Sequence, residues 1–119
     1  MTHLVNKNCR VIDNDEVSLQ GDDLTHYRAQ IDNSWSVVEE EHLSRRFMFS
    51  NYQEAVEFTN QVADVADSEG HHPEIKLSYG EVEVKVTTHE LGGLHENDFI
   101  VAAKIDRQHR DFREEAESN

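Results

Sequence analysis

Apolar residues along the chain recur with two different periods, one of three to four residues and one of two. Helical spacing first appears over residues 22–33, behind a pair of aspartates that favour a helix N-terminus. Alternate spacing follows over residues 35–49, where an acidic cluster at 39–41 divides two apolar stretches. This pattern predicts a helix followed by a hairpin.

A second apolar stripe at helical spacing covers residues 50–70. Ser50 is followed three residues later by Gln53, which is the spacing of a capping box at a helix start. Gly70 is expected to end this helix, and Pro73 prevents it from resuming.

The period returns to two over residues 75–88, with Gly80 at the turn of a second hairpin. A third helix is expected around Phe99, and its apolar stripe ends where the chain becomes fully charged beyond Asp106. Two hairpins without a parallel crossover predict an α+β fold. In this fold a four-stranded antiparallel sheet carries three helices on one face, in the order α-β-β-α-β-β-α.

The length of 119 residues predicts a single domain. Residues 1–21 are polar and aperiodic, which is typical of an extended N-terminal arm. The domain itself is expected to cover residues 22–110. Residues 111–119 are expected to form a charged C-terminal tail.

Charge and composition exclude several classes of protein. The 25 acidic and 11 basic residues give a net charge of −14, which leaves no basic surface to bind nucleic acid. No apolar run is long enough to cross a membrane or to resemble a signal peptide, so we expect a cytoplasmic protein without a membrane partner. Cys9 is the only cysteine, so neither an internal disulfide nor a cysteine zinc site is predicted.

Candidate chemistry gathers at one edge of the predicted sheet. His71 and His72 precede Pro73, which favours extended backbone before it. His89 follows the last strand, on the side opposite the valines. Because the hairpin returns antiparallel, the three histidines can converge at this edge. Three explanations remain open on the residues alone: ordinary surface histidines, a metal site, or acid–base chemistry.

The metal explanation has little support in the sequence. His89-Glu90 and His95-Glu96 both begin like a zinc-protease helix, but the positions four residues on from the histidines are Gly93 and Phe99, so the HExxH motif is absent. We therefore expect no metal and no other cofactor.

The chain resembles the pterin-4a-carbinolamine dehydratases. The resemblance extends over about residues 21–110 and includes several stretches with matching spacing. The residues that carry it are Asp67-x3-His71-His72-Pro73, Tyr79, Thr87-Thr88-His89-Glu90, Gly93-Leu94-x-Glu96-Asn97-Asp98-Phe99-Ile100, Trp35, and Phe47-x-Phe49-Ser50-Asn51-Tyr52.

The resemblance implies an enzyme that removes water from 4a-hydroxytetrahydropterin to give quinonoid dihydropterin, in support of tetrahydrobiopterin recycling after aromatic amino acid hydroxylation. An acid must protonate the leaving hydroxyl and a base must take a proton from the neighbouring ring nitrogen. Imidazoles can do both near neutral pH. The implied partners are a pterin substrate and a functional link to an aromatic amino acid hydroxylase.

The resemblance also implies roles for individual residues. His71 and His89 are the expected acid–base pair, and His72 is expected to orient the substrate. Asp67 stands where the family usually has glutamate and would orient an imidazole or hold the pterin. The substrate-binding set expected in this way is Asp67, Pro73, Thr88 and Trp35. For Trp35 a place in the core is an equal alternative, and Asp98 is expected to stabilise the third helix.

A different class of function also remains open. Some family members act as dimerisation partners of a transcription factor, so a protein-binding regulatory module is the alternative. Family members are commonly homodimers or homotetramers, and we expect the same here because the outer strand of the first hairpin lacks a neighbour.

Overall fold

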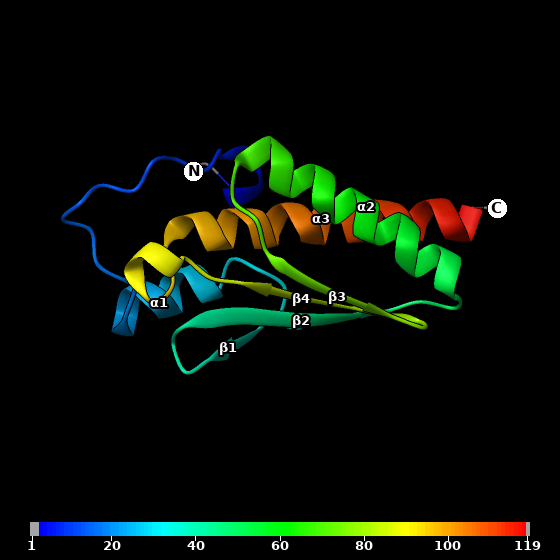
Figure 1. Cartoon of the computed structure of the whole chain (residues 1–119), viewed down its shortest axis with the longest axis horizontal. Coiled ribbons are helices and arrows are strands. Elements are labelled where there is room, and N and C mark those ends of the chain that lie inside the picture. Colours follow the sequence, from blue (N-terminus) through cyan, green and yellow to red (C-terminus); the bar gives the residue numbers. More distant parts are fainter. Residues whose placement is uncertain (1–2, 119) are drawn as a thin grey trace.

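The computed structural model describes residues 3–118, with side chains through residue 115 (Figure 1). A short 3-10 turn lies in the N-terminal arm, and another lies between the last strand and the last helix. In chain order the elements are η1 (Leu4–Asn6), α1 (Gly21–Arg28), β1 (Ser36–Val38), β2 (His42–Met48), α2 (Tyr52–Glu69), β3 (Glu74–Ser78), β4 (Glu81–Val86), η2 (His89–Leu91) and α3 (Glu96–Ser118).

The four strands form one antiparallel sheet in the order β1-β2-β4-β3. Val82, Val84 and Val86 of β4 are fully buried, and the residues between them are partly exposed. This alternation gives the sheet an apolar inner face and a polar outer face. The predicted α+β fold with two hairpins is confirmed.

Helices α2 and α3 lie side by side over the inner face (Figure 1). Their buried Phe58 and Ile105 belong to the same core as Leu43 and Phe47 of β2. Helix α1 packs on the first turns of α3, where the Tyr27 ring lies 5.5 Å from the Phe99 ring. None of the helices in the described part of the chain is both long and apolar enough to span a membrane.

Helix α2 has well-defined ends, and the second of them places His71. At its start Asn51, not Ser50, is the N-cap, because its side chain accepts a hydrogen bond from the backbone N–H of Glu54 at 2.9 Å. At its end Gly70 has a φ of 65°, the left-handed conformation that closes many helices. The predicted stop at Gly70 is confirmed, whereas the predicted Ser50–Gln53 box is shifted by one residue.

Two helix boundaries differ from the sequence pattern. Helix α1 ends at Arg28 rather than at residue 33, and residues 29–34 form turns in which Asp32 accepts from the Ser34 backbone N–H. Residues 111–118, which the sequence pattern sets apart as a tail, continue α3. The helix persists because Phe112 remains buried, with its ring 5.5 Å from that of Phe49.

The N-terminal arm is attached to the domain by specific contacts. Leu4 is buried in the core, and the Leu19 N–H donates to the Leu94 carbonyl at 2.8 Å. Lys7 pairs with Glu96 at the start of α3 at 2.7 Å. The arm therefore runs along the N-terminal end of α3.

His109 is an ionisable group set among aromatic rings of the core. Its imidazole lies 4.9 Å from Phe47 and 5.6 Å from Phe58, between ring centroids. Its buried Nε2 has no hydrogen-bond partner among the described residues. Burial, together with the charges of Arg45 and Arg113, lowers the pKa of His109 to about 4.

This lowered pKa predicts a loss of stability in acid. Between about pH 6.5, the usual pKa of histidine, and pH 4 the unfolded chain binds a proton that the folded chain rejects. The free energy of unfolding of the native protein should therefore fall, relative to that of His109→Phe, as the pH falls through this window. Denaturant titrations at several pH values measure the difference, in which the carboxylate titrations common to both proteins cancel.

His26 provides the matched control for this prediction because it lies exposed on α1. The difference between native protein and His26→Phe should not change over the same window. A native-to-His109→Phe difference that stays constant from pH 6.5 to 4 would contradict the prediction.

Candidate active site

The site is organised around the carboxylate of Asp98, which is fully buried in the first turn of α3. One oxygen lies 2.6 Å from Nε2 of His71. The other accepts from the Thr88 hydroxyl at 2.7 Å and from the His95 backbone N–H at 2.9 Å. Three hydrogen bonds compensate for the burial of the charge. Asp98 thus joins the end of α2, the end of β4 and the start of α3.

Asp98 determines how His71 presents its imidazole. An ionised carboxylate only accepts hydrogen bonds, so Nε2 of His71 carries the hydrogen and donates it. In the neutral ring Nδ1 then keeps its lone pair, which can take a proton from a ligand. The same division of roles between a buried carboxylate and an imidazole operates in serine hydrolases.

His72 has a carboxylate partner of a different kind. Its Nε2 lies 3.0 Å from Oδ1 of Asp67, but the side chains are 63% and 80% exposed. An exposed pair of this type contributes little free energy. Asp67 therefore lies beside an imidazole, and it does not line either of the two cavities described below.

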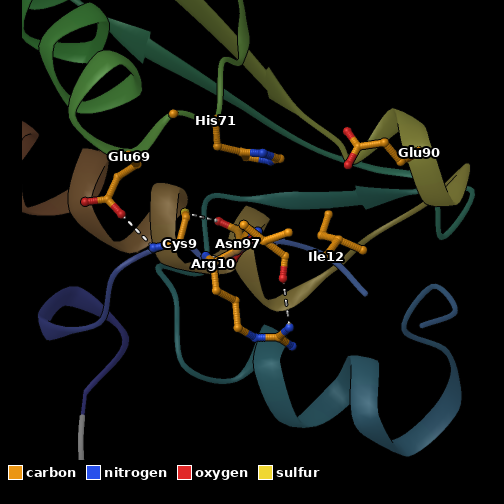
Figure 2. Close-up of a pocket in the computed structure, with 9 residues that line it drawn as sticks. Cys9, Arg10, Ile12, Glu69, His71, Glu90 and Asn97 are labelled. Atoms are coloured by element: carbon orange, nitrogen blue, oxygen red, sulfur yellow. Dashed lines mark hydrogen bonds between the residues drawn. The ribbon is translucent and has the colours of Figure 1, made fainter. Parts of the chain in front are cut away.

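The first of these, which we call the inner cavity, lies beside the helices and has a volume of about 350 Å³. Figure 2 shows the His71 ring pointing toward Glu90 on one side, with the arm residues Cys9, Arg10 and Ile12 on the other. The cavity is lined by Cys9, Arg10, Val11, Ile12, Glu69, Gly70, His71, Glu90 and Asn97.

The second, which we call the outer cavity, has a volume of about 210 Å³ and lies at the same end of the sheet. It brings His72 and His89 together with His42 at the start of β2. Lys85 and Glu74 face each other across the β3–β4 pair. The full lining is His42, His72, Glu74, Lys85, Thr87 and His89.

The two cavities lie on opposite sides of the sheet end. Neighbours in sequence line different cavities: His71 and Glu90 the inner one, His72 and His89 the outer one. His71 and His72 lie in the stretch that Pro73 biases toward extended backbone, where successive side chains point to opposite faces, whereas His89 and Glu90 are the first two residues of the 3-10 turn η2. All three predicted histidines meet at this edge of the sheet, but only His72 and His89 share a cavity.

The other predicted residues have structural partners. Thr88 is fully buried, and its hydroxyl is committed to Asp98 rather than offered to a cavity. Trp35 is 1% exposed in the core, where its Nε1 donates to Asp106 at 2.8 Å. Pro73 is half-buried between His72 and β3, outside the lining of either cavity. These three residues therefore support the site without facing its open space.

His95 caps α3 in a way that its residue type does not suggest. Its Nδ1 accepts from the Asn97 backbone N–H at 3.0 Å, and its Nε2 lies 3.0 Å from Glu16 of the arm. The imidazole thus replaces the hydroxyl acceptor of a usual helix cap. The start of α3, and with it Asp98, is consequently well defined.

Two ionisable groups of the inner cavity are held in definite charge states. Burial and the nearby Glu69 carboxylate raise the pKa of Cys9 to about 12, so its thiol stays protonated. Burial alone would raise the pKa of Glu69, but hydrogen bonds from Lys104 and from the Cys9 backbone outweigh it and hold that pKa below its usual value. Cys9 is therefore neutral and Glu69 ionised at neutral pH.

The side chains of the described residues form no group of three or more histidine, cysteine or acidic side chains arranged to hold a metal ion. The polar groups that line the two cavities include imidazoles, carboxylates and one lysine. Such groups are suited to moving protons to and from a bound ligand.

A family comparison agrees with this arrangement. The sequence model described as "Pterin 4 alpha carbinolamine dehydratase" matches residues 17–108. The chain belongs to this family. The matched segment contains all three histidines together with Asp98, whereas the arm residues of the inner cavity precede it.

Curated relatives within the pterin 4 alpha carbinolamine dehydratase family match this chain over different shares of their length. A protein of Alkaliphilus metalliredigens, provisionally named pterin-4-alpha-carbinolamine dehydratase, is 39% identical over 108 residues, which cover 91% of this chain and 97% of the relative. A protein of Halorhodospira halophila with the same provisional name is 56% identical over 62 residues, which cover 52% of this chain and 57% of the relative.

Solved structures show the same fold. A transcriptional coactivator/pterin dehydratase from Brucella melitensis superposes with a TM-score of 0.70 at 28% identity, over 76% of this chain and 96% of that one. A pterin dehydratase-like protein described as a RuBisCO assembly factor in the alpha-carboxysome gives a TM-score of 0.56 at 24% identity, over 65% and 90% of the two chains. The second likeness shows a shared fold only.

Sequence reasoning missed several residues that line the two cavities. Lys85 and Thr87 alternate with the buried valines, so the sequence already placed them on the same face of the sheet as His89. The place of His42 could not be predicted, because it reaches the outer cavity through the register that pairs Leu43 with Val86. The arm residues left no signal, since they are held mainly through their backbone.

Replacement of Asp98 by asparagine tests the assigned hydrogen of His71. The amide nitrogen of Asp98→Asn would donate where the carboxylate accepted, and this should move the hydrogen of His71 from Nε2 to Nδ1. Nitrogen-15 NMR of the histidine side chains distinguishes the two forms. Loss of one buried charged hydrogen bond should also lower stability by about 1–3 kcal/mol.

Asp67→Asn is the matched control, since it makes the same chemical change at the exposed partner of His72. It should leave both the His71 spectrum and the stability nearly unchanged. An Asp98→Asn protein whose His71 still carries its hydrogen on Nε2 would show that Asp98 does not set the tautomer.

Proposed function

We propose that this protein dehydrates 4a-hydroxytetrahydropterin to quinonoid dihydropterin by histidine acid–base catalysis, with His71, His72 and His89 as the reacting groups. The substrate class is supported by membership of the pterin dehydratase family. In a cytoplasm that also contains an aromatic amino acid hydroxylase, this reaction would return the spent pterin to tetrahydrobiopterin recycling.

The observation that carries the proposal is the bond between His71 and the fully buried Asp98. Burial of a carboxylate costs free energy, and here the carboxylate orients an imidazole at the wall of a cavity. A histidine with only a surface role would not need this arrangement. Acid–base catalysis does need it, because the imidazole must present a defined nitrogen to the ligand.

The reaction balances with two imidazoles and no other reagent. One protonated imidazole gives its proton to the 4a-hydroxyl, and the C4a–O bond breaks as water leaves. The second, neutral imidazole takes the proton from N5, and the electron pair of that N–H bond forms the N5=C4a double bond. The enzyme returns to its starting form when the two imidazoles exchange a proton with solvent.

The position of the histidines accommodates this chemistry at the end of the sheet. His71 approaches from the inner side, while His72 and His89 approach from the outer side. A flat pterin at this edge, between the two segments, would have an imidazole on either side. His71 and His89 would then be the acid–base pair and would exchange roles for the opposite stereoisomer of the hydroxyl, while His72 orients the ring.

Removal of either catalytic imidazole should abolish most of the rate enhancement. His71→Ala and His89→Ala should each lower kcat for dehydration by about 10²–10⁴-fold, which is the usual contribution of a positioned acid or base. His72→Ala should mainly raise KM. The substrate is generated in place by a phenylalanine hydroxylase, and water loss is followed spectroscopically.

His26→Ala is the control, because His26 lies exposed on α1 away from both cavities. It should retain native kcat and KM. A native protein that does not accelerate dehydration, or a His71→Ala protein with undiminished kcat, would refute the mechanism.

We also propose that the chain assembles into a homodimer or homotetramer. Within the described residues β1 pairs only with β2, and β3 only with β4, so both edges of the sheet are open. Pairing of such edges between copies would satisfy their backbone groups. Light scattering at micromolar concentration should give a mass of two or four chains, and a mass of one chain would contradict the proposal.

A protein-binding regulatory role is the second candidate, favoured by the name of the Brucella melitensis structure. Here Met48, Tyr52 and Tyr79 are large apolar residues left exposed. A regulatory module would keep its partner binding when His71 and His89 are both replaced by alanine, whereas the enzyme would lose its activity.

A further inference from the structure

We propose that residues 9–12 of the N-terminal arm form the substrate-contacting wall of the inner cavity, and that Asn97 is the positioning residue that holds this wall opposite His71. The proposal rests on the proposed pterin dehydratase function and adds a specificity element to it. These arm residues precede the segment matched by the family model.

Asn97 holds the arm through both halves of its amide. Its Oδ1 accepts from the Arg10 backbone N–H at 3.0 Å, and its Nδ2 donates to the Arg10 carbonyl at 2.8 Å. The residue is only 3% exposed. This pair of bonds imitates one rung of a β-ladder and fixes the arm backbone relative to the start of α3.

A second attachment acts on the preceding residue. The Cys9 N–H donates to Oε1 of Glu69 at 2.7 Å, while Lys104 pairs with the other oxygen at 2.6 Å. Both partners are nearly buried, with side-chain exposures of 5% and 13%. The arm is therefore attached to the end of α2 as well as to α3, at the two helices that also position His71 and Asp98.

The ionisable side chains of the wall carry no unpaired charge. The Arg10 guanidinium is bound by both oxygens of Glu16, at 2.8 and 3.0 Å, and lies 3.8 Å from Glu96. The Cys9 thiol is neutral because of its raised pKa. An anionic ligand would therefore find no unpaired cation on this wall.

The wall instead offers apolar surface. Val11 is 88% exposed and Ile12 is half-buried, and both line the cavity (Figure 2 labels Ile12). A single exposed valine is ordinary on a protein surface. Position distinguishes Val11, because it lines the same cavity as His71, whose imidazole is held by the buried Asp98 carboxylate. A flat, uncharged heterocycle such as a reduced pterin, bound at the sheet edge and extending into the inner cavity, would lie between this apolar wall and the His71 imidazole.

A charge placed on the wall tests the proposal without disturbing the core. Val11→Asp should raise KM for 4a-hydroxytetrahydropterin about tenfold, which corresponds to about 1.4 kcal/mol, while kcat stays within about twofold. Val17→Asp is the matched control, because Val17 is 80% exposed on the same arm but does not line the cavity. It should keep the native KM. An unchanged KM in Val11→Asp, or an equal rise in both variants, would overturn the proposal.

The positioning role of Asn97 is tested by a split between kinetic constants. Asn97→Ala should raise KM with little change in kcat and should speed hydrogen exchange at the Arg10 amide, because that N–H loses its acceptor. Asn14→Ala, at an exposed position of the arm, should change neither. If Asn97→Ala instead lowers kcat and leaves KM and the exchange rate native, Asn97 does not act through the arm.

Direct binding separates this proposal from the proposed function. Calorimetric titration with 7,8-dihydropterin should show binding to the native protein and weaker binding to Val11→Asp. No binding by the native protein would overturn the proposed function. Equal binding by native protein and Val11→Asp would overturn the wall proposal alone.

Discussion

The buried carboxylate of Asp98 is the interaction on which the rest of the site depends. It is fully inaccessible and accepts three hydrogen bonds, from His71, Thr88 and the His95 backbone. These donors come from the segments after α2, after β4 and before α3. A displacement of any one of them would leave a buried charge partly unsatisfied. The hydrogen bonds to Asp98 that hold the three segments together therefore also orient the His71 imidazole. For this reason Asp98 has both roles, the helix-stabilising role expected from the sequence and a role in positioning an imidazole.

Most of the fold could be predicted because its periods are local. The valines of β4 alternate without interruption, and the stripe of α2 ends at a glycine in the left-handed conformation, so both elements were visible in the sequence. Errors occurred where a contact distant in sequence decided the boundary. Helix α3 continues beyond the expected start of the tail because Phe112 reaches the core. The cap of α2 moved to Asn51 because two acceptors stood next to each other, and sequence spacing alone does not choose between them.

The meeting of the three histidines at one end of the sheet was predictable from the sequence, but the geometry of their surroundings was less so. The antiparallel return of the second hairpin predicts that His71, His72 and His89 lie at one end of the sheet, and the structure has them there. Their division between two cavities depends on which way adjacent side chains point, and the stiff segment before Pro73 makes His71 and His72 diverge. Thr88 and Trp35 were expected to bind substrate, but their polar atoms donate hydrogen bonds to the buried carboxylates of Asp98 and Asp106. Burial decides whether a motif residue faces a ligand, and burial depends on contacts that no local pattern contains.

The contacts of the N-terminal arm could not be predicted from the sequence either. A polar, aperiodic segment is typical of loosely held chain, because no apolar stripe indicates that it packs. Here the ordering contacts run through the backbone: Asn97 binds both polar groups of Arg10, and Glu69 binds the Cys9 N–H. Backbone groups are the same at every residue, so the side-chain sequence of the arm could not reveal these bonds. The groups that bind the arm backbone are side chains of the facing helices, namely the buried amide of Asn97 and the buried carboxylate of Glu69. A buried polar side chain without a partner in its own element is therefore the signal that a neighbouring segment must supply one.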